Sequence, residues 1–478
     1  MRRYWFACLL VLPFCAHAAP PAQQWFTVLL DGRKIGTFES SRVMHDSEVV
    51  TTQTLDLVLD RAGSRVALYS TERSTETSAG KPVAFHSASR LSDSETTIDG
   101  TLRGSTIDVT TRTGGDTRQR RMPWPHGALL PEGLRQAALR AGLKPGTHYR
   151  ALSFQPSSLD AIEVASTIHA PEDVDLPDGH MMLSRIEQTL AIPGAPMKTR
   201  AWVDADQTIY KLTMPVMGVD LTLLACDRAC ATAPNQPSDV FARTLVHSPR
   251  PLTRTELAGT LRYTLTPRAH TAALALPQTD EQRVASEGMA SVVTVGGSGE
   301  PRDETPPRAD DFQPNDWLQS DAPEVVRLAR RAVGDARDPL QRMQRIETFV
   351  RHYIRNKNLD VGYASALEVA RKPEGDCTEH AVLVAALGRT LGIATRVVDG
   401  LAYAPGFAGK DQVFVPHAWA QAWVDSRWQS FDAALSGFDA GHIALSIGNG
   451  DPWRFYSGLG LLGRIDMDSV EAGGEPIH

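Results

Sequence analysis

Hydrophobic and polar residues alternate over most of the first half of the chain, which is typical of strands with one buried face. Residues 55–59 show the alternation clearly, and Asp31-Gly32 and Asp99-Gly100 have the form of tight hairpin turns. One helical stretch, Glu132 to Ala141, interrupts the strand pattern. The pattern predicts a long antiparallel sheet that curls around one helix, over residues 19–235.

The pattern changes twice further along the chain. Residues 236–300 form a second, smaller strand-rich region, and residues 301–318 are polar and proline-rich, which indicates a linker. Residues 319–478 begin with helical periodicity and continue with strand alternation. We therefore expect an α+β protein of about three domains, in which antiparallel β-rich regions precede a C-terminal α+β domain.

Candidate chemistry begins at Cys377, which stands between Gly375-Asp376 and Thr378-Glu379-His380-Ala381, directly before an apolar run. Asp376 three residues ahead of Glu379 has the form of a helix N-terminal capping box, so Cys377 should be the first helical residue. A sulfur there faces unpaired backbone N–H groups and the positive end of the helix dipole. This setting favours the thiolate, which is the reactive form of cysteine.

His417 and Asp432 complete a candidate constellation. His417 starts an alternating strand, Asp425-Ser426 marks a turn, and Asp432 follows the returning strand. A two-residue loop would make Asp432 a diagonal neighbour of His417 on one face, within hydrogen-bond reach, whereas another loop length would turn it to the opposite face. In this arrangement His417 takes the proton from Cys377, and Asp432 fixes the tautomer of the imidazole.

Several neighbouring side chains have simpler interpretations. His380 forms Cys-x-x-His with the cysteine, but no further metal ligands follow, so we interpret it as a structural histidine. Arg396 is expected to anchor a carboxylate or carbonyl. Trp419 and Trp423 are expected to pack, and one of them could shield the site from water. The arginines within residues 118–121 indicate a solvated edge or a processing site.

Residues 1–18 have the parts of an export signal: the basic start Arg2-Arg3, a short apolar stretch and the small-x-small site Ala16-His17-Ala18. We expect cleavage after Ala18 and a periplasmic or secreted protein. No later segment approaches about 20 consecutive apolar residues, so we expect no integral membrane span. Loss of the two arginines moves the net charge from −7 to −9, which gives no support to nucleic-acid binding.

The cysteines of the mature chain are Cys226, Cys230 and Cys377. In an oxidising compartment Cys226 and Cys230 could form a local disulfide. Two free thiols and half of a zinc site are the alternatives for this pair, although no second Cys/His pair lies nearby at ligand spacing. A disulfide would leave Cys377 as the odd thiol, and an odd thiol in an exported protein indicates a function.

Four ordered blocks carry a resemblance to the transglutaminase-like superfamily, over about residues 320–440. They are Gly375 to Ala381, Leu391 to Gly400, His417-Ala418-Trp419 and Phe431-Asp432-Ala433. The resemblance implies a papain-like thiol site with Cys377 as nucleophile, His417 as base and Asp432 as the group that orients the base. The strand-rich region in front resembles the half-barrel sheets of exported bacterial proteins, which implies a scaffold or a partner-binding surface.

The resemblance implies an exported thiol-dependent amide hydrolase that acts on a protein or peptide through an acyl-thioester on Cys377, with no cofactor and no metal. A protein-glutamine transglutaminase would use the same three residues. A catalytically silent binding module is the alternative without chemistry. The upstream tryptophan and the acidic calcium loop of animal cross-linking members have no counterpart in the sequence, which favours hydrolysis. The sequence does not predict an oligomeric state.

Overall fold

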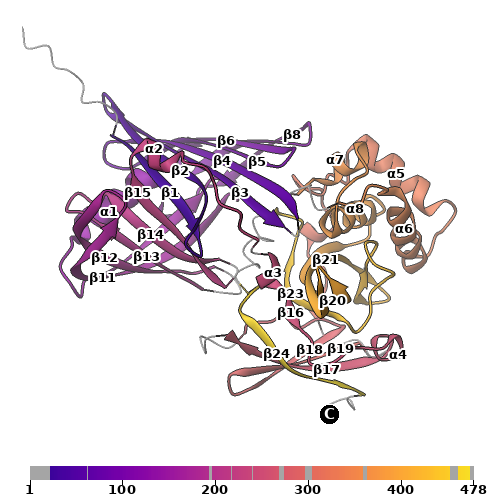
Figure 1. The fold of residues 1–478 in the computed structure, drawn as a ribbon. Helices are drawn as coiled ribbons and strands as arrows, with labels where there is room; N and C mark the ends of the chain where they lie inside the picture. The colour runs from indigo at the N-terminus through magenta and orange to yellow at the C-terminus, as the bar shows by residue number, and fades with distance from the viewer. Residues whose placement is uncertain are drawn as a thin grey trace, which may run out of the picture.

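The computed structural model describes residues 22–61, 63–192, 196–216, 218–239, 241–268, 274–296, 304–358, 363–452 and 461–473. The predicted export signal, residues 1–18, lies outside the described residues. The strands form three sheets, and most of the long helices lie in the C-terminal region (Figure 1). A β-rich chain with helices and strands together at its C-terminal end agrees with the predicted α+β class.

The largest sheet has fifteen strands in the order β8-β7-β6-β5-β4-β3-β2-β1-β15-β14-β13-β12-β11-β10-β9. The strands are β1 (Ala22–Leu30), β2 (Arg33–His45), β3 (Glu48–Arg61), β4 (Ser64–Thr77), β5 (Pro82–Leu91), β6 (Ser94–Arg103), β7 (Thr106–Thr113), β8 (Asp116–Pro123), β9 (Ala128–Leu129), β10 (His148–Gln155), β11 (Asp160–Leu176), β12 (Gly179–Leu190), β13 (Met197–Val203), β14 (Ile209–Val216) and β15 (Val219–Cys226). The chain therefore builds the sheet outward from β1 to β8, crosses over, and returns from β9 to pair β15 with β1.

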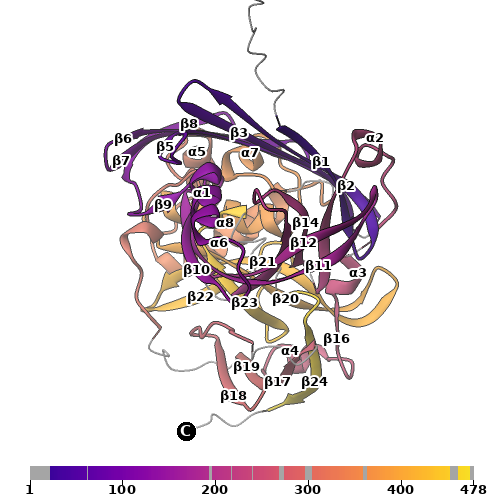
Figure 2. The same cartoon turned by 90° about the vertical axis from the view of Figure 1, so that its left-hand side faces the viewer.

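Helix α1 (Pro131–Ala141) lies inside the curve of this sheet, between its two arms (Figure 2). It contacts β3 and β4 of one arm and β9 and β10 of the other. Glu76 of β4 accepts hydrogen bonds from the backbone N–H groups of Glu132, at 2.7 Å, and Gly133, at 2.8 Å. A carboxylate from the sheet thus caps the positive end of the helix. The sheet is antiparallel except for the pair of β9 and β10, which is parallel, and it curves around this one helix.

A second sheet has four strands in the order β18-β19-β17-β24. They are β17 (Thr260–Pro267), β18 (Gln282–Glu287), β19 (Ala290–Gly296) and β24 (Ile465–Ala472). The last strand comes from the C-terminal end of the chain and pairs antiparallel with β17. This sheet therefore contains strands from both predicted regions, 236–300 and 319–478. The sequence does not predict this pairing, because pairing between distant segments leaves no local signal.

The C-terminal region combines helices with the third sheet. The helices are α5 (Pro323–Val333), α6 (Pro339–Tyr353), α7 (Ala366–Arg371) and α8 (Cys377–Thr390), and the short helices α2 (Arg228–Ala231), α3 (Phe241–Thr244), α4 (Arg254–Leu257) and η2 (Ala309–Asp311) lie earlier in the chain. The sheet contains β16 (Val246–His247), β20 (Thr395–Phe407), β21 (Lys410–Val424), β22 (Arg427–Phe431) and β23 (His442–Gly448). Its order is β16-β21-β20-β23, and β22 pairs with β21.

The described part of the predicted linker, residues 304–318, packs on the C-terminal region. Arg396 donates to Glu304 at 2.5 Å, and its guanidinium lies over the ring of Trp428 at 4.0 Å. Both side chains of the ion pair are 11% exposed. Arg396 therefore anchors a carboxylate, as predicted, and the segment is held in place at this point.

The large sheet docks on the C-terminal helices. Leu91, at the end of β5, is buried in the same hydrophobic core as the helices α5 to α8. Arg120 of β8 makes two-pronged hydrogen bonds of 2.9–3.0 Å with Asp316, and Arg118 pairs with Asp321. These arginines lie on the edge strand β8, where Arg120 and Arg121 are exposed as predicted. Two of them, Arg118 and Arg120, also join segments about two hundred residues apart in the chain.

Cys226 and Cys230 form a disulfide with a Cα–Cα distance of 6.0 Å. The bond ties the end of β15 to α2, next to the central pairing of β1 with β15. Of the alternatives for this pair, the disulfide is confirmed. Among the residues that the structure describes, we find no helix with the length and apolar character needed to span a bilayer.

Candidate active site

Cys377 is the first residue of α8, as predicted. Asp376 Oδ1 accepts from the backbone N–H of Thr378 at 2.9 Å, and Glu379 Oε2 accepts from the backbone N–H of Asp376 at 2.8 Å. These bonds are the predicted capping box. Gly375 has a φ of +132°, and a Cβ there would lie 2.4 Å from Glu379 Cγ, so the turn before the cysteine needs a glycine.

The thiol lies where the helix meets the third sheet. Helix α8 packs on β20 and β21, as Figure 1 shows. Cys377 is partly buried and packs against the core that contains Ala418 and Phe431. These two residues are the chain neighbours of His417 and Asp432. The start of the helix and the hairpin therefore share one core.

The hairpin that carries His417 and Asp432 has the predicted two-residue loop. Val424 pairs with Arg427, and the loop residues Asp425 and Ser426 have φ values of 51° and 62°. Such a turn matches the twist of the flanking strands. The pairing continues to Phe431, where β22 ends, so Asp432 is the first residue beyond the strand.

His417 and Asp432 form a buried hydrogen bond. His417 Nε2 lies 2.8 Å from Asp432 Oδ2, and the side chains are 8% and 1% exposed. Burial alone would raise the pKa of Asp432, but the charge and hydrogen bond of His417, with those of His442, hold it well below its usual range. The carboxylate is therefore ionised, and the Nδ1 atom of His417 is the ring nitrogen left for a reacting group.

The backbone of Asp432 is fixed by helix α6. Arg351 donates to the Asp432 carbonyl at 3.0 Å, and Glu347 Oε1 accepts from the Asp432 backbone N–H at 3.1 Å. Glu347 and Arg351 also pair with each other at 3.2 Å. Sequence reasoning missed both residues, because a Glu–Arg pair four positions apart is common on exposed helix faces.

A second imidazole, His442, also contacts the carboxylate. Its Nε2 lies 3.1 Å from Asp432 Oδ2, and its Nδ1 lies 3.0 Å from Asp439 Oδ1. Burial alone would lower the pKa of His442, but hydrogen bonds and charges of Asp432 and Asp439 raise it to about 9. Sequence reasoning missed His442, since it reaches the site from β23, which pairs with β20.

The other predicted side chains have structural contacts. His380 Nδ1 lies 2.6 Å from the Asp376 carbonyl, and burial lowers the pKa of this imidazole. Trp419 is 2% exposed, and its ring stacks beside His417 at a centroid distance of 6.2 Å. Trp423 packs edge-on against Trp428. Trp419 and Trp423 are therefore packing residues, as predicted.

His417, Asp432 and His442 have the donor set of a two-histidine, one-carboxylate metal site, with ligand atoms within 4.8 Å of one another. A metal would require both Nε2 atoms to be unprotonated. The two Nε2 atoms lie 2.8 and 3.1 Å from one oxygen of Asp432, which are N–H···O hydrogen-bond distances. Hydrogen bonds therefore explain why these three side chains lie together.

A cavity of about 440 Å³ lies next to the connection between α7 and α8, which ends at Cys377. Its walls include Ser92 and Asp93 from the β5–β6 turn of the large sheet, and Asn356 and Glu374 from the C-terminal region. Two regions of the chain therefore build this cavity together, and its lining does not include Cys377, His417 or Asp432.

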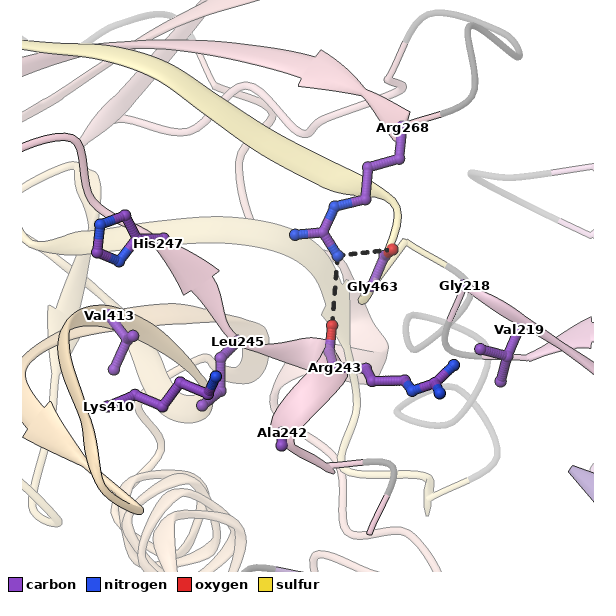
Figure 3. A pocket seen from close by; sticks show the side chains of 10 residues that line it. All are labelled: Gly218, Val219, Ala242, Arg243, Leu245, His247, Arg268, Lys410, Val413 and Gly463. Atoms are coloured by element: carbon purple, nitrogen blue, oxygen red, sulfur yellow. Dashed lines mark hydrogen bonds between the residues drawn. The ribbon is translucent and has the colours of Figure 1, made fainter. Parts of the chain in front are cut away.

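Another cavity, of about 490 Å³, lies among α3, β16, β21 and the segment before β24 (Figure 3). Arg268 crosses one side of it and donates to the carbonyls of Gly463 at 3.1 Å and Arg243 at 3.4 Å. The lining does not include Cys377, His417 or Asp432. This cavity is separate from the candidate site.

Residues 326–433 match the family profile of the Transglutaminase-like superfamily. The resemblance predicted over residues 320–440 is confirmed by this match, and this segment of the chain is similar to the Transglutaminase-like superfamily. It contains Cys377, His417 and Asp432. No match was found among curated proteins.

Solved structures give weaker similarities. A beta-barrel-like protein of a domain of unknown function from Brucella abortus has 12% identity and a TM-score of 0.35, covering 43% of this chain and 96% of that chain. A candidate cysteine protease from Cytophaga hutchinsonii has 16% identity and a TM-score of 0.28, covering 45% and 88%. A candidate protease from Parabacteroides distasonis has 10% identity and a TM-score of 0.21, covering 74% and 68%. TM-scores this low do not establish a shared fold.

Proposed function

We propose that the protein is an exported thiol-dependent amide hydrolase with Cys377 as nucleophile, His417 as base and Asp432 as the residue that orients the base. The observation that carries the proposal is the buried 2.8 Å hydrogen bond between His417 and Asp432, on a hairpin that shares its core with the start of α8. A base held by a carboxylate can take the proton of a thiol, and a helix N-terminus favours the thiolate form of a cysteine.

The reaction has two steps. Cys377 Sγ attacks the amide carbonyl carbon, the C–N bond breaks, and the amine leaves with the proton that His417 took from the thiol. Water then attacks the acyl-thioester while His417 accepts a water proton, and the acid leaves as the thiol re-forms. The backbone N–H of Cys377, at the start of α8, is suited to stabilise the developing oxyanion.

The substrate is proposed to be a protein or peptide. The match of residues 326–433 to the Transglutaminase-like superfamily supports this assignment, because that superfamily includes enzymes that act on proteins and peptides.

The experiment incubates the mature chain with a casein-like protein and a labelled primary amine. We expect new peptide fragments and no amine incorporation from the wild type, and neither product from Cys377→Ser. His352→Gln, on the exposed end of α6, is the matched control and should behave as the wild type. Amine incorporation without cleavage would assign the transglutaminase reaction instead. Wild-type protein that gives neither product would contradict the proposal.

A further inference from the structure

His442 bonds to the carboxylate that holds His417, although it lies in a different strand. Its Nε2 is 3.1 Å from Asp432 Oδ2, the same atom that His417 Nε2 approaches at 2.8 Å. We propose that His442 is a positioning residue, which donates a hydrogen bond to Asp432 and keeps this carboxylate aimed at His417. The inference rests on the proposed function, because it gives His442 a part in activating the same thiol.

The contacts of Asp432 require a proton on each imidazole nitrogen that faces it. Asp432 Oδ1 accepts from the backbone N–H groups of Ala434, at 2.8 Å, and Leu435, at 3.2 Å. Oδ2 faces the two Nε2 atoms, and an ionised carboxylate only accepts hydrogen bonds. His417 and His442 must therefore both donate through Nε2, which leaves His417 Nδ1 unprotonated in the neutral ring and able to take the thiol proton.

The ring of His442 is fixed by its surroundings. It is 2% exposed, and it packs against Phe438 at a centroid distance of 5.0 Å and against Trp419 at 5.3 Å. Asp439 holds Nδ1 at 3.0 Å on the side away from Asp432. A buried ring held at both nitrogens keeps a single orientation, which is what a positioning residue needs.

His442 also sets the charge near His417. Its ring lies between two carboxylates, those of Asp432 and Asp439, and its centroid is 5.7 Å from that of His417. With its pKa raised to about 9, His442 carries a positive charge near neutral pH. The charged and titratable groups around it and around Asp432 are Asp432, Asp439, His417, Glu347, Arg351, His380 and Lys357.

Two substitutions test the hydrogen bond and the charge of His442 separately. His442→Gln retains an N–H donor near the position of Nε2 but carries no charge, whereas His442→Phe keeps the ring packing and has neither donor nor charge. His352→Gln is again the matched control. The measurement is the rate of alkylation of Cys377 by iodoacetamide as a function of pH, with the melting temperature of each variant measured in parallel.

We expect His442→Phe to lower the alkylation rate near pH 7 by about tenfold to a hundredfold, because a hydrogen bond to a charged group is lost. His442→Gln should recover most of this rate. The acidic midpoint of the alkylation rate should move to higher pH by about one unit in this variant, because removal of a nearby positive charge makes the thiolate bind a proton more tightly.

Three results would overturn the inference. One is an unchanged rate and pH profile in both His442 variants. Another is an equal loss of alkylation rate in both variants with no shift of the acidic midpoint, which would show that the role of His442 is purely structural. A third is a wild-type alkylation rate that changes with EDTA or added zinc, which would show that His417, Asp432 and His442 bind a metal. Ordinary thiol reactivity in the wild type would instead contradict the proposed function, so the two failures are distinguishable.

Discussion

The large sheet and the C-terminal region both place a carboxylate beside a histidine, but in opposite settings. In the sheet, Asp99 contacts His86 and Arg112 at 2.8 Å, and these side chains are 41–53% exposed. In the C-terminal region, Asp432 contacts His417 and His442, and all three side chains are 8% exposed or less. Water competes with the first set and is excluded from the second, so only the buried set can fix a tautomer and a charge.

This difference is best tested with matched substitutions of the two carboxylates. Asp432→Asn should lower kcat/KM by about ten-thousandfold, because an amide can present its N–H to His417 and favour the wrong tautomer. Asp99→Asn makes the same chemical change beside a histidine and an arginine, and it should leave kcat/KM unchanged. Similar losses in both variants would show that burial does not distinguish the two sites.

A second matched pair compares arginines. Arg389 is 4% exposed and donates to the carbonyls of Thr395 and Gln313. Arg389→Met should lower the free energy of unfolding by about 4 kcal/mol, since buried carbonyls lose their donors. Arg150 pairs with Glu163 on the large sheet, where the side chains are 74% and 51% exposed.

Arg150→Met should change the free energy of unfolding by less than about 0.5 kcal/mol. Urea denaturation measures the free energy of unfolding of both arginine variants, so that the two losses can be compared. A cost for Arg150→Met as large as that for Arg389→Met would contradict the contrast between the regions.

The pH dependence of stability should report the charge of His442. Its folded-state pKa of about 9 lies above the ordinary histidine value, about 6.5. The folded state therefore binds the proton more tightly, so this stabilisation is fully present below about pH 6.5 and is lost as pH rises through about 9. The stability advantage of the wild type over His442→Gln should fall by about 3 kcal/mol across this range, measured by urea denaturation. A constant difference would show that His442 stays neutral.

An intermediate effect is expected where the two regions meet. Arg120 and Asp316 are 41% and 13% exposed, between the settings compared above. A double-mutant cycle with Arg120→Ala and Asp316→Ala should give a coupling energy of about 1 kcal/mol. A coupling energy near zero would show that the Arg120–Asp316 pair contributes as little to stability as the exposed pairs of the large sheet.

The features that the sequence predicted are those encoded within a few residues of each other. The cap at Cys377 depends on Asp376 and Glu379, three positions apart, and the capping box is present. The contact of His417 with Asp432 depends on a two-residue turn and an alternating strand, which set the register locally. Close spacing made both features visible without a structure.

Features that depend on distant pairing could not be predicted. His442 reaches Asp432 because β23 pairs with β20, and β24 completes the small sheet because it pairs with β17. Arg120 meets Asp316 across nearly two hundred residues. In each case the local sequence is compatible with a solvated strand or turn, and only tertiary packing decides the partner.

The central claim is that His417 holds the thiol of Cys377 as a thiolate. Its most direct test is the rate of iodoacetamide alkylation of Cys377 between pH 4 and 10, in the wild type and in His417→Ala. We expect the wild type to react rapidly well below pH 8.5, the ordinary thiol pKa, and His417→Ala to lose this reactivity. A single titration near pH 8.5 in the wild type, unchanged by His417→Ala, would contradict the account.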